Sequence, residues 1–126
     1  MMEGGASNVY GLAALDAGVA MLEALGIQRI FDHVQAWHDA VEPLLLERGF
    51  TSARTAYSEG RSGTLSLQPP PGNDAPTWAN ALAAQGISCA SPDGWLRFAP
   101  HWPNALTDAH VLVSAIDSIT NDLSRP

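Results

Sequence analysis

The chain has 126 residues, enough for one domain that buries roughly two-thirds of the surface its unfolded form would expose. Its composition, 46% hydrophobic and 15% charged, is typical of a soluble globular protein and excludes a disordered one. The formal net charge of −7, with only six basic residues, argues against nucleic-acid binding, which needs basic patches.

The chain carries one cysteine, Cys89, which excludes an internal disulfide bond and leads us to expect a cytoplasmic location. The longest apolar run, residues 11–25, contains Asp16 and Glu23. That run is too short and too polar to span a bilayer, so we expect no membrane partner.

The first predicted helix covers residues 9–25 and ends at Gly26, a residue suited to a helix C-terminus. It carries one large apolar stripe at helical spacing, formed by Leu12, Leu15, Val19 and Leu22. Small apolar residues cover another side: Ala13, Ala14, Ala17, Gly18 and Met21. A helix that is apolar on most sides needs several packing partners, and we infer that one of them is missing from this chain. The alternative is a central core helix rich in alanine.

The second predicted helix covers residues 27–48, with Pro43 in its interior and Gly49 at its end. Its amphipathic face consists of Ile27, Ile30, Phe31, Val34, Trp37, Val41, Leu44 and Leu45. His33 and His38 are five residues apart, whereas a metal-binding pair on a helix is four apart. We therefore expect both histidines on a solvated surface, and no metal site in the chain.

Two short strands are predicted next, at residues 50–56 and 62–68, and a run of three prolines ends the second. A third helix follows, capped by Asn73 or Asp74 and with Pro76 in its first turn.

Two more strands are predicted at residues 87–91 and 95–99, joined by a tight turn at 92–94. Cys89 should be a packed thiol and not a nucleophile, because no histidine or lysine lies nearby in sequence. Thr107 caps the last helix, whose core stripe consists of Leu112, Ala115, Ile116, Ile119 and Leu123. The order α-α-β-β-α-β-β-α predicts a single α+β domain over residues 1–126, with a small, mostly antiparallel sheet covered by helices on one face.

Arg97 is the residue most suggestive of a ligand. Strand alternation directs Leu96 and Phe98 to the core and Arg97 away from it. No acidic residue lies in the segment 94–107, so Arg97 has no counter-ion close in sequence. A planar cation on a rigid strand suits a carboxylate or a phosphate. The alternative is a surface arginine, or a salt bridge to a distant segment.

The segment 96–104 resembles the R-x-S-x-H-x-Y-N motif near the C-terminus of class V aminotransferases and cysteine desulfurases. These are fold-type I enzymes that depend on pyridoxal phosphate (PLP). The resemblance implies that Arg97 grips the substrate α-carboxylate, and that His101 and Asn104 are the motif's His and Asn. Two positions depart from the motif. Ala99 stands where the family usually has Ser, and Pro103 stands where it usually has Tyr.

The opening segment 3–11 resembles the E-G-G-T-x-N-x-x-G stretch that follows the large PLP domain in the same family. There it approaches the cofactor phosphate, which implies a cofactor-binding role for Ser7 and Asn8. Ala6 replaces the family's threonine. The alternative is a flexible start followed by a helix N-cap.

The chain contains no lysine, since all six of its basic residues are arginines. Enzymes of the family it resembles hold PLP as a Schiff base on a lysine amine. These 126 residues alone therefore cannot hold the cofactor covalently, and we expect no catalytic residue and no cofactor in this chain.

The resemblance covers nearly the whole chain and implies the C-terminal small domain of a class V enzyme, separated from its large PLP-binding domain and inactive alone. Its implied partners are that domain or a second copy of the chain, with an amino-acid substrate only in the complete enzyme. The alternative is a stand-alone binding or scaffold module that kept the fold and lost catalysis.

Overall fold

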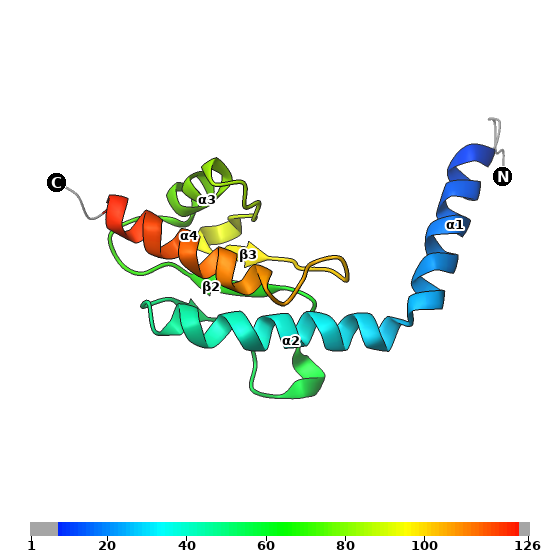
Figure 1. The fold of residues 1–126 in the computed structure, drawn as a ribbon, viewed down its shortest axis with the longest axis horizontal. Helices are drawn as coiled ribbons and strands as arrows, with labels where there is room; N and C mark the ends of the chain where they lie inside the picture. The colour runs from blue at the N-terminus through cyan, green and yellow to red at the C-terminus, as the bar shows by residue number, and fades with distance from the viewer. Residues whose placement is uncertain (1–7, 124–126) are drawn as a thin grey trace.

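The structure, a computed structural model, describes residues 8–123 (Figure 1). Its elements follow one another as α1 (Val9–Leu25), α2 (Ile27–Leu46), β1 (Thr51–Ser52), the 3-10 turn η1 (Ser58–Gly60), β2 (Leu65–Gln68), α3 (Ala75–Ala84), the 3-10 turn η2 (Pro92–Gly94), β3 (Leu96–Phe98) and α4 (Asp108–Leu123). The strands form one antiparallel sheet in the order β1-β2-β3. The predicted α+β class and the antiparallel sheet are confirmed.

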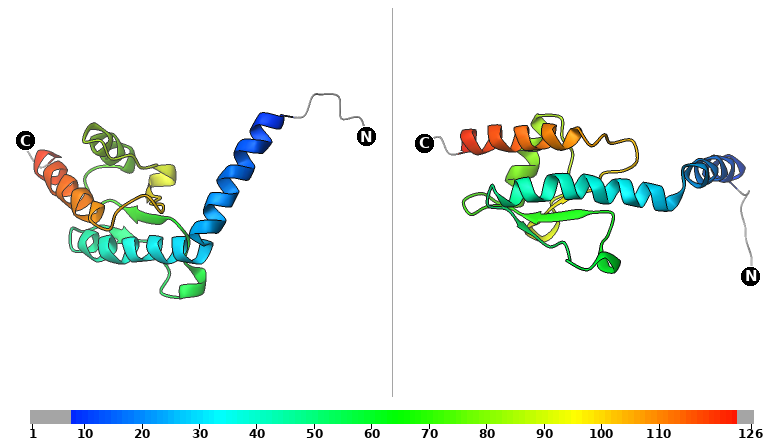
Figure 2. Two further views of the ribbon diagram at one scale, coloured as in Figure 1. Left: turned by 45° about the vertical axis from the view of Figure 1, so that its right-hand side comes forward. Right: turned by 60° about the horizontal axis from the view of Figure 1, so that its bottom comes forward.

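One face of the sheet is buried against the helices. Leu65 and Leu67 of β2, with Leu96 and Phe98 of β3, are at most 4% exposed, as period-two alternation predicts. The helices supply the rest of this core: Trp37, Val41, Leu45, Trp78, Leu82, Leu112, Ile116 and Ile119. Each large apolar side chain buried in this way contributes about 1.5–3 kcal/mol. Figure 2 shows α2 and α4, which pack together, side by side.

The prediction of four strands is wrong, because the sheet among residues 8–123 has three. The predicted strand 87–91 contributes only one bridge, in which Ala90 and Arg97 exchange backbone hydrogen bonds of 3.1 and 2.7 Å. The predicted turn at 92–94 is present as the 3-10 turn η2, in which Asp93 and Gly94 have positive φ. The predicted strand 50–56 is reduced to β1, because pairing with β2 beyond Ser52 consists of one hydrogen bond from Ala53.

The helix ends are close to the positions that their capping residues predict. Gly26 has φ 86° and its backbone N–H donates to the carbonyl of Leu22, which ends α1. Asp74 caps α3 by accepting a hydrogen bond of 2.9 Å from the backbone N–H of Thr77. Cys89 is half-buried against the core, and burial raises the pKa of its thiol, as expected of a packed cysteine.

α1 projects away from the rest of the molecule, which makes the arrangement in Figures 1 and 2 L-shaped. It bends from α2 by 72° at Gly26, and none of its residues is buried. The alternative that α1 is a central core helix is therefore wrong for residues 8–123. Within residues 8–123 no single helix is long and apolar enough to cross a membrane; only α1 and α2 counted together, as a bent pair, reach that length and composition.

Candidate functional site

Arg97 lies where strand alternation placed it. It is exposed at the centre of β3, on the sheet face opposite the buried Leu96 and Phe98. On the neighbouring strand β2 it pairs with Ser66. No carboxylate among the described residues forms an ion pair with its guanidinium. The side chain is therefore a solvated cation on a rigid strand, on the face of the sheet away from the core.

The loop after β3 is held in shape by Asn104. Its side-chain oxygen accepts a hydrogen bond of 2.9 Å from the backbone N–H of His101, and its backbone oxygen lies 2.7 Å from Nε2 of His33 on α2. His101 itself is exposed. The structure thus joins His101 to Asn104, but no hydrogen bond connects either residue to Arg97 within residues 8–123. The role of Asn104 that the contacts support is to order the loop, and a substrate contact stays a prediction.

Of the two predicted cofactor-binding residues, Ser7 lies outside the described residues. Asn8 caps α1, and its side-chain oxygen accepts a hydrogen bond of 2.9 Å from the backbone N–H of Gly11. Figure 1 shows the N-terminal end of α1 far from β3 and the loop that follows it. Within this chain, Asn8 and Arg97 therefore do not belong to one site.

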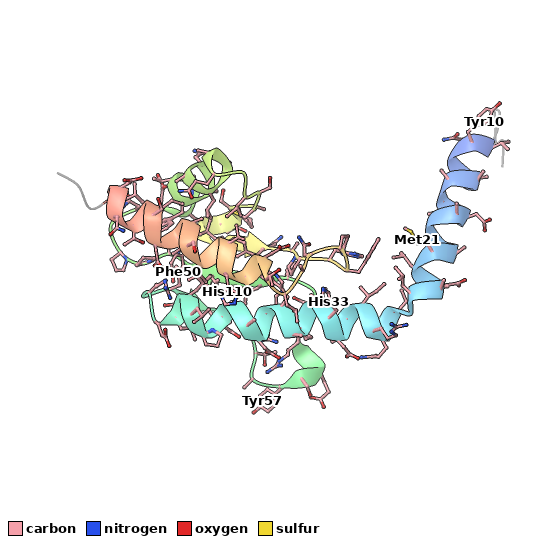
Figure 3. The ribbon with its side chains drawn as sticks, in the orientation of Figure 1. Tyr10, Met21, His33, Phe50, Tyr57 and His110 are labelled. Carbon is pink, nitrogen blue, oxygen red and sulfur yellow. The ribbon has the colours of Figure 1, made fainter. Side chains whose placement is uncertain are left out.

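α1 presents a large apolar surface to solvent. Its exposed side chains include Tyr10 at 91%, Leu15 at 63% and Met21 at 49%. Figure 3 shows Tyr10 at the end of α1 that is far from the other elements, and Met21 on the side of α1 that is turned toward them. Asp16 and Glu23 are its only charged residues. They lie seven residues apart, on one narrow strip of the helix, so most of the circumference is apolar. A helix of this kind is normally buried on several sides.

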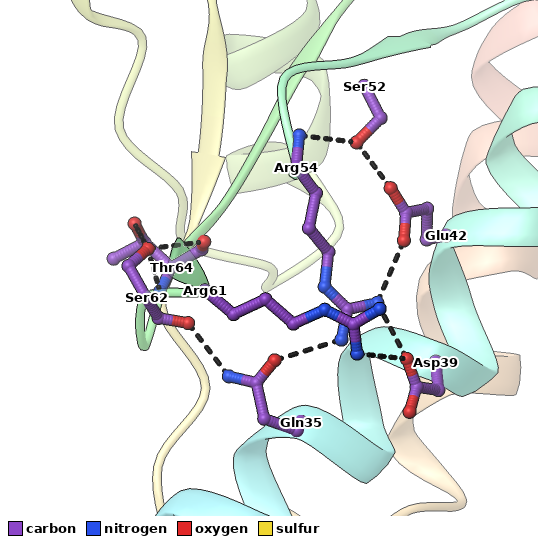
Figure 4. A network of polar contacts seen from close by, with 8 residues as sticks. All are labelled: Gln35, Asp39, Glu42, Ser52, Arg54, Arg61, Ser62 and Thr64. Atoms are coloured by element: carbon purple, nitrogen blue, oxygen red, sulfur yellow. Dashed lines mark hydrogen bonds and ion pairs between the residues drawn. The ribbon is translucent and has the colours of Figure 1, made fainter. Parts of the chain in front are cut away.

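A polar network between α2 and the segment after β1 was not predicted (Figure 4). The Arg54 guanidinium donates to Asp39 at 2.6 Å, to Glu42 at 2.8 Å and to the side chain of Gln35 at 2.9 Å. The hydroxyl of Ser52 donates to Glu42 in turn. The Arg54 side chain is only 6% exposed, so this is a largely buried charge with matched partners. The polar side of the network on α2 could have been found from the i, i+4, i+7 spacing of Gln35, Asp39 and Glu42. Its arginine lies in the irregular segment after β1, which no spacing on α2 predicts.

His38 is fully buried, so the expectation that it lies on a solvated surface is wrong. It follows Trp37 on α2 and shares a wide apolar stripe with Val34, Val41 and Leu45, which faces the rest of the domain. Burial, followed by the nearby positive charge of Arg54, lowers the pKa of His38 from 6.5 to about 4. Its ring nitrogens have no hydrogen-bond partner among the described residues, which makes it a buried, neutral and unsatisfied side chain.

A pocket of about 390 Å³ lies between the end of β3, the start of α4 and the segment after α3. Trp37 of α2 and Phe98 of β3 form part of its lining, and Asp108 lies at the start of α4. Arg97 and His101 do not line it. The described residues therefore include two separate features with ligand chemistry: an exposed arginine on one side of the sheet, and a pocket with both apolar and polar lining on the side of the helices.

PLP does not fit this chain as a covalently bound group. The sequence has no lysine amine, and Asn8, the described one of the two residues predicted to bind the cofactor, caps its own helix. Residues 8–123 also contain no group of three His, Cys, Asp or Glu side chains that could hold a metal ion. Comparison with protein-family models and with curated proteins finds no match for this chain.

Proposed function

We propose that this chain is the substrate-binding C-terminal domain of a PLP-dependent enzyme similar to class V aminotransferases and cysteine desulfurases, and that it works only when docked on a PLP-binding domain. The observation that carries the proposal is the exposure of α1. This helix has no buried residue, yet most of its circumference is apolar. It is the surface through which the domain docks.

The shape of the apolar surface favours a large partner over a single helix. Leu12, Leu15 and Val19 lie on one side of α1, whereas Tyr10 and Met21 lie on another. A second helix packed in parallel would cover one of these sides only. A partner that contacts both sides, such as the surface of a whole domain, removes far more apolar area from water at about 25 cal/mol per Å².

Arg97 is the substrate-binding group in this proposal. In a closed, water-excluding site, a bidentate contact between its guanidinium and a substrate carboxylate contributes roughly 1.5–3 kcal/mol. In the isolated chain Arg97 is exposed, and the same contact contributes only about 0–1 kcal/mol. Even millimolar binding requires about 4 kcal/mol. We therefore expect no Arg97-dependent binding of an amino acid by the chain alone.

The experiment is an affinity purification of the tagged chain from its native cells, followed by borohydride reduction and peptide mass spectrometry. We expect a co-purifying protein that carries PLP on its own lysine, and no PLP adduct on any internal residue of this chain. The matched control is Leu15→Glu, which places a charge on the apolar surface of α1 and should release the partner. Purification of the wild-type chain without any PLP-bearing protein would overturn the proposal.

A further inference from the structure

We propose that the pocket between β3, α4 and the segment after α3 binds a small primary amine with an apolar body. The pocket has a volume of about 390 Å³. Small-molecule pockets range from about 300 to 1,000 Å³, so this one accommodates a single ring with a short side chain. Its apolar walls come from Trp37, Ile87, Phe98, Pro100, Val111 and Leu112.

The charge in the pocket selects a cation. Asp108 is the only charged residue among the described residues that line it. One oxygen of its carboxylate accepts a hydrogen bond of 3.0 Å from the backbone N–H of Ala105, and the other has no partner within residues 8–123. An ammonium group is the complementary ligand, because it donates up to three hydrogen bonds and carries the charge opposite to that of the Asp108 carboxylate. A carboxylate on the same ligand would meet Asp108 unfavourably, so simple monoamines fit better than amino acids.

The pocket is built within the domain and needs no partner. One wall belongs to the loop after β3, which Asn104 fastens through the 2.7 Å contact between its backbone oxygen and Nε2 of His33. Another wall is Trp37, which is 6% exposed and fixed in the core. Walls held in this way bind with little ordering cost. The site is independent of α1 and Arg97, so its test does not depend on the function proposed above.

The test is a titration of the purified chain, followed by NMR, with 2-phenylethylamine and with its neutral counterpart 2-phenylethanol. We expect saturable binding of the amine, with the largest shifts at the indole N–H of Trp37, which has no acceptor among the described residues. Asp108→Asn should weaken the binding of the amine about three- to tenfold and leave the binding of the alcohol unchanged. The control variant Asp16→Asn on α1 removes the same charge far from the pocket. It should change the binding of neither the amine nor the alcohol.

A second variant tests the cavity without touching the carboxylate. Val111 is 60% exposed at the pocket, so Val111→Trp can fill the opening without disturbing the core, and it should abolish binding of both ligands. The proposal is overturned if the amine does not saturate, if amine and alcohol bind equally well, or if Asp108→Asn and Asp16→Asn have the same effect.

Discussion

His38 should make the stability of this domain depend on pH between about 6.5 and 4. Because burial lowers its pKa from 6.5 to about 4, the unfolded chain binds a proton in this range and the folded chain does not. The free energy of unfolding is therefore highest above pH 6.5 and falls as the pH falls, with a total loss of about 3 kcal/mol at about pH 4. Each pH unit between the two pKa values costs about 1.4 kcal/mol.

The informative comparison is between pH 8 and pH 5.5, which stays above the isoelectric point of about 4.7. Urea unfolding followed by circular dichroism should show a loss of about 1.4 kcal/mol for the wild-type protein over this interval. Most carboxylates remain ionised at pH 5.5, so the loss reports mainly on histidine.

His38→Leu is the deciding variant. It removes the ionisable group and the two unsatisfied ring nitrogens at similar volume, so it should be no less stable than the wild type at pH 8 and should lack the pH-dependent loss. His110→Gln, at an exposed position on α4, controls for the removal of one histidine. The reasoning is refuted if the wild type is equally stable at pH 8 and pH 5.5, or if His38→Leu loses as much stability as the wild type.

Three further predictions concern stability measured by urea unfolding. Arg54→Ala should cost about 3–5 kcal/mol, because it leaves the Glu42 carboxylate, whose side chain is only 17% exposed, without its cation. Arg48→Ala, whose partner on α4 is half exposed, should cost only about 0–1 kcal/mol. A similar loss in both variants would contradict this. Arg97→Ala should change stability by less than about 0.5 kcal/mol, since the side chain is exposed and outside any ion pair of the described residues; a loss above 1 kcal/mol would assign it a structural role. Leu15→Glu should leave the unfolding midpoint of the core unchanged, whereas Leu82→Ala should cost about 2–5 kcal/mol; a destabilised core in Leu15→Glu would mean that α1 packs on the domain.

The sequence by itself determined the features whose physical cause lies within a few residues. Asp74 predicts the start of α3 because its side chain reaches a backbone N–H only three residues away. Gly26 predicts the end of α1 because it adopts positive φ without strain. Alternation at Leu96, Arg97 and Phe98 predicts two buried side chains and one exposed cation, since successive side chains of a strand point to opposite faces.

The tertiary structure alone decided the features that depend on distant partners. The segment 87–91 has a strand-like sequence but forms a single bridge, because pairing requires a neighbouring strand in register and β3 offers it only at Arg97. The burial of His38 and the partners of Arg54 depend on which elements pack against α2, and no local pattern encodes that choice. The same holds for α1: its sequence determines an apolar helix, but only the packing of the chain shows that the helix finds no cover within residues 8–123.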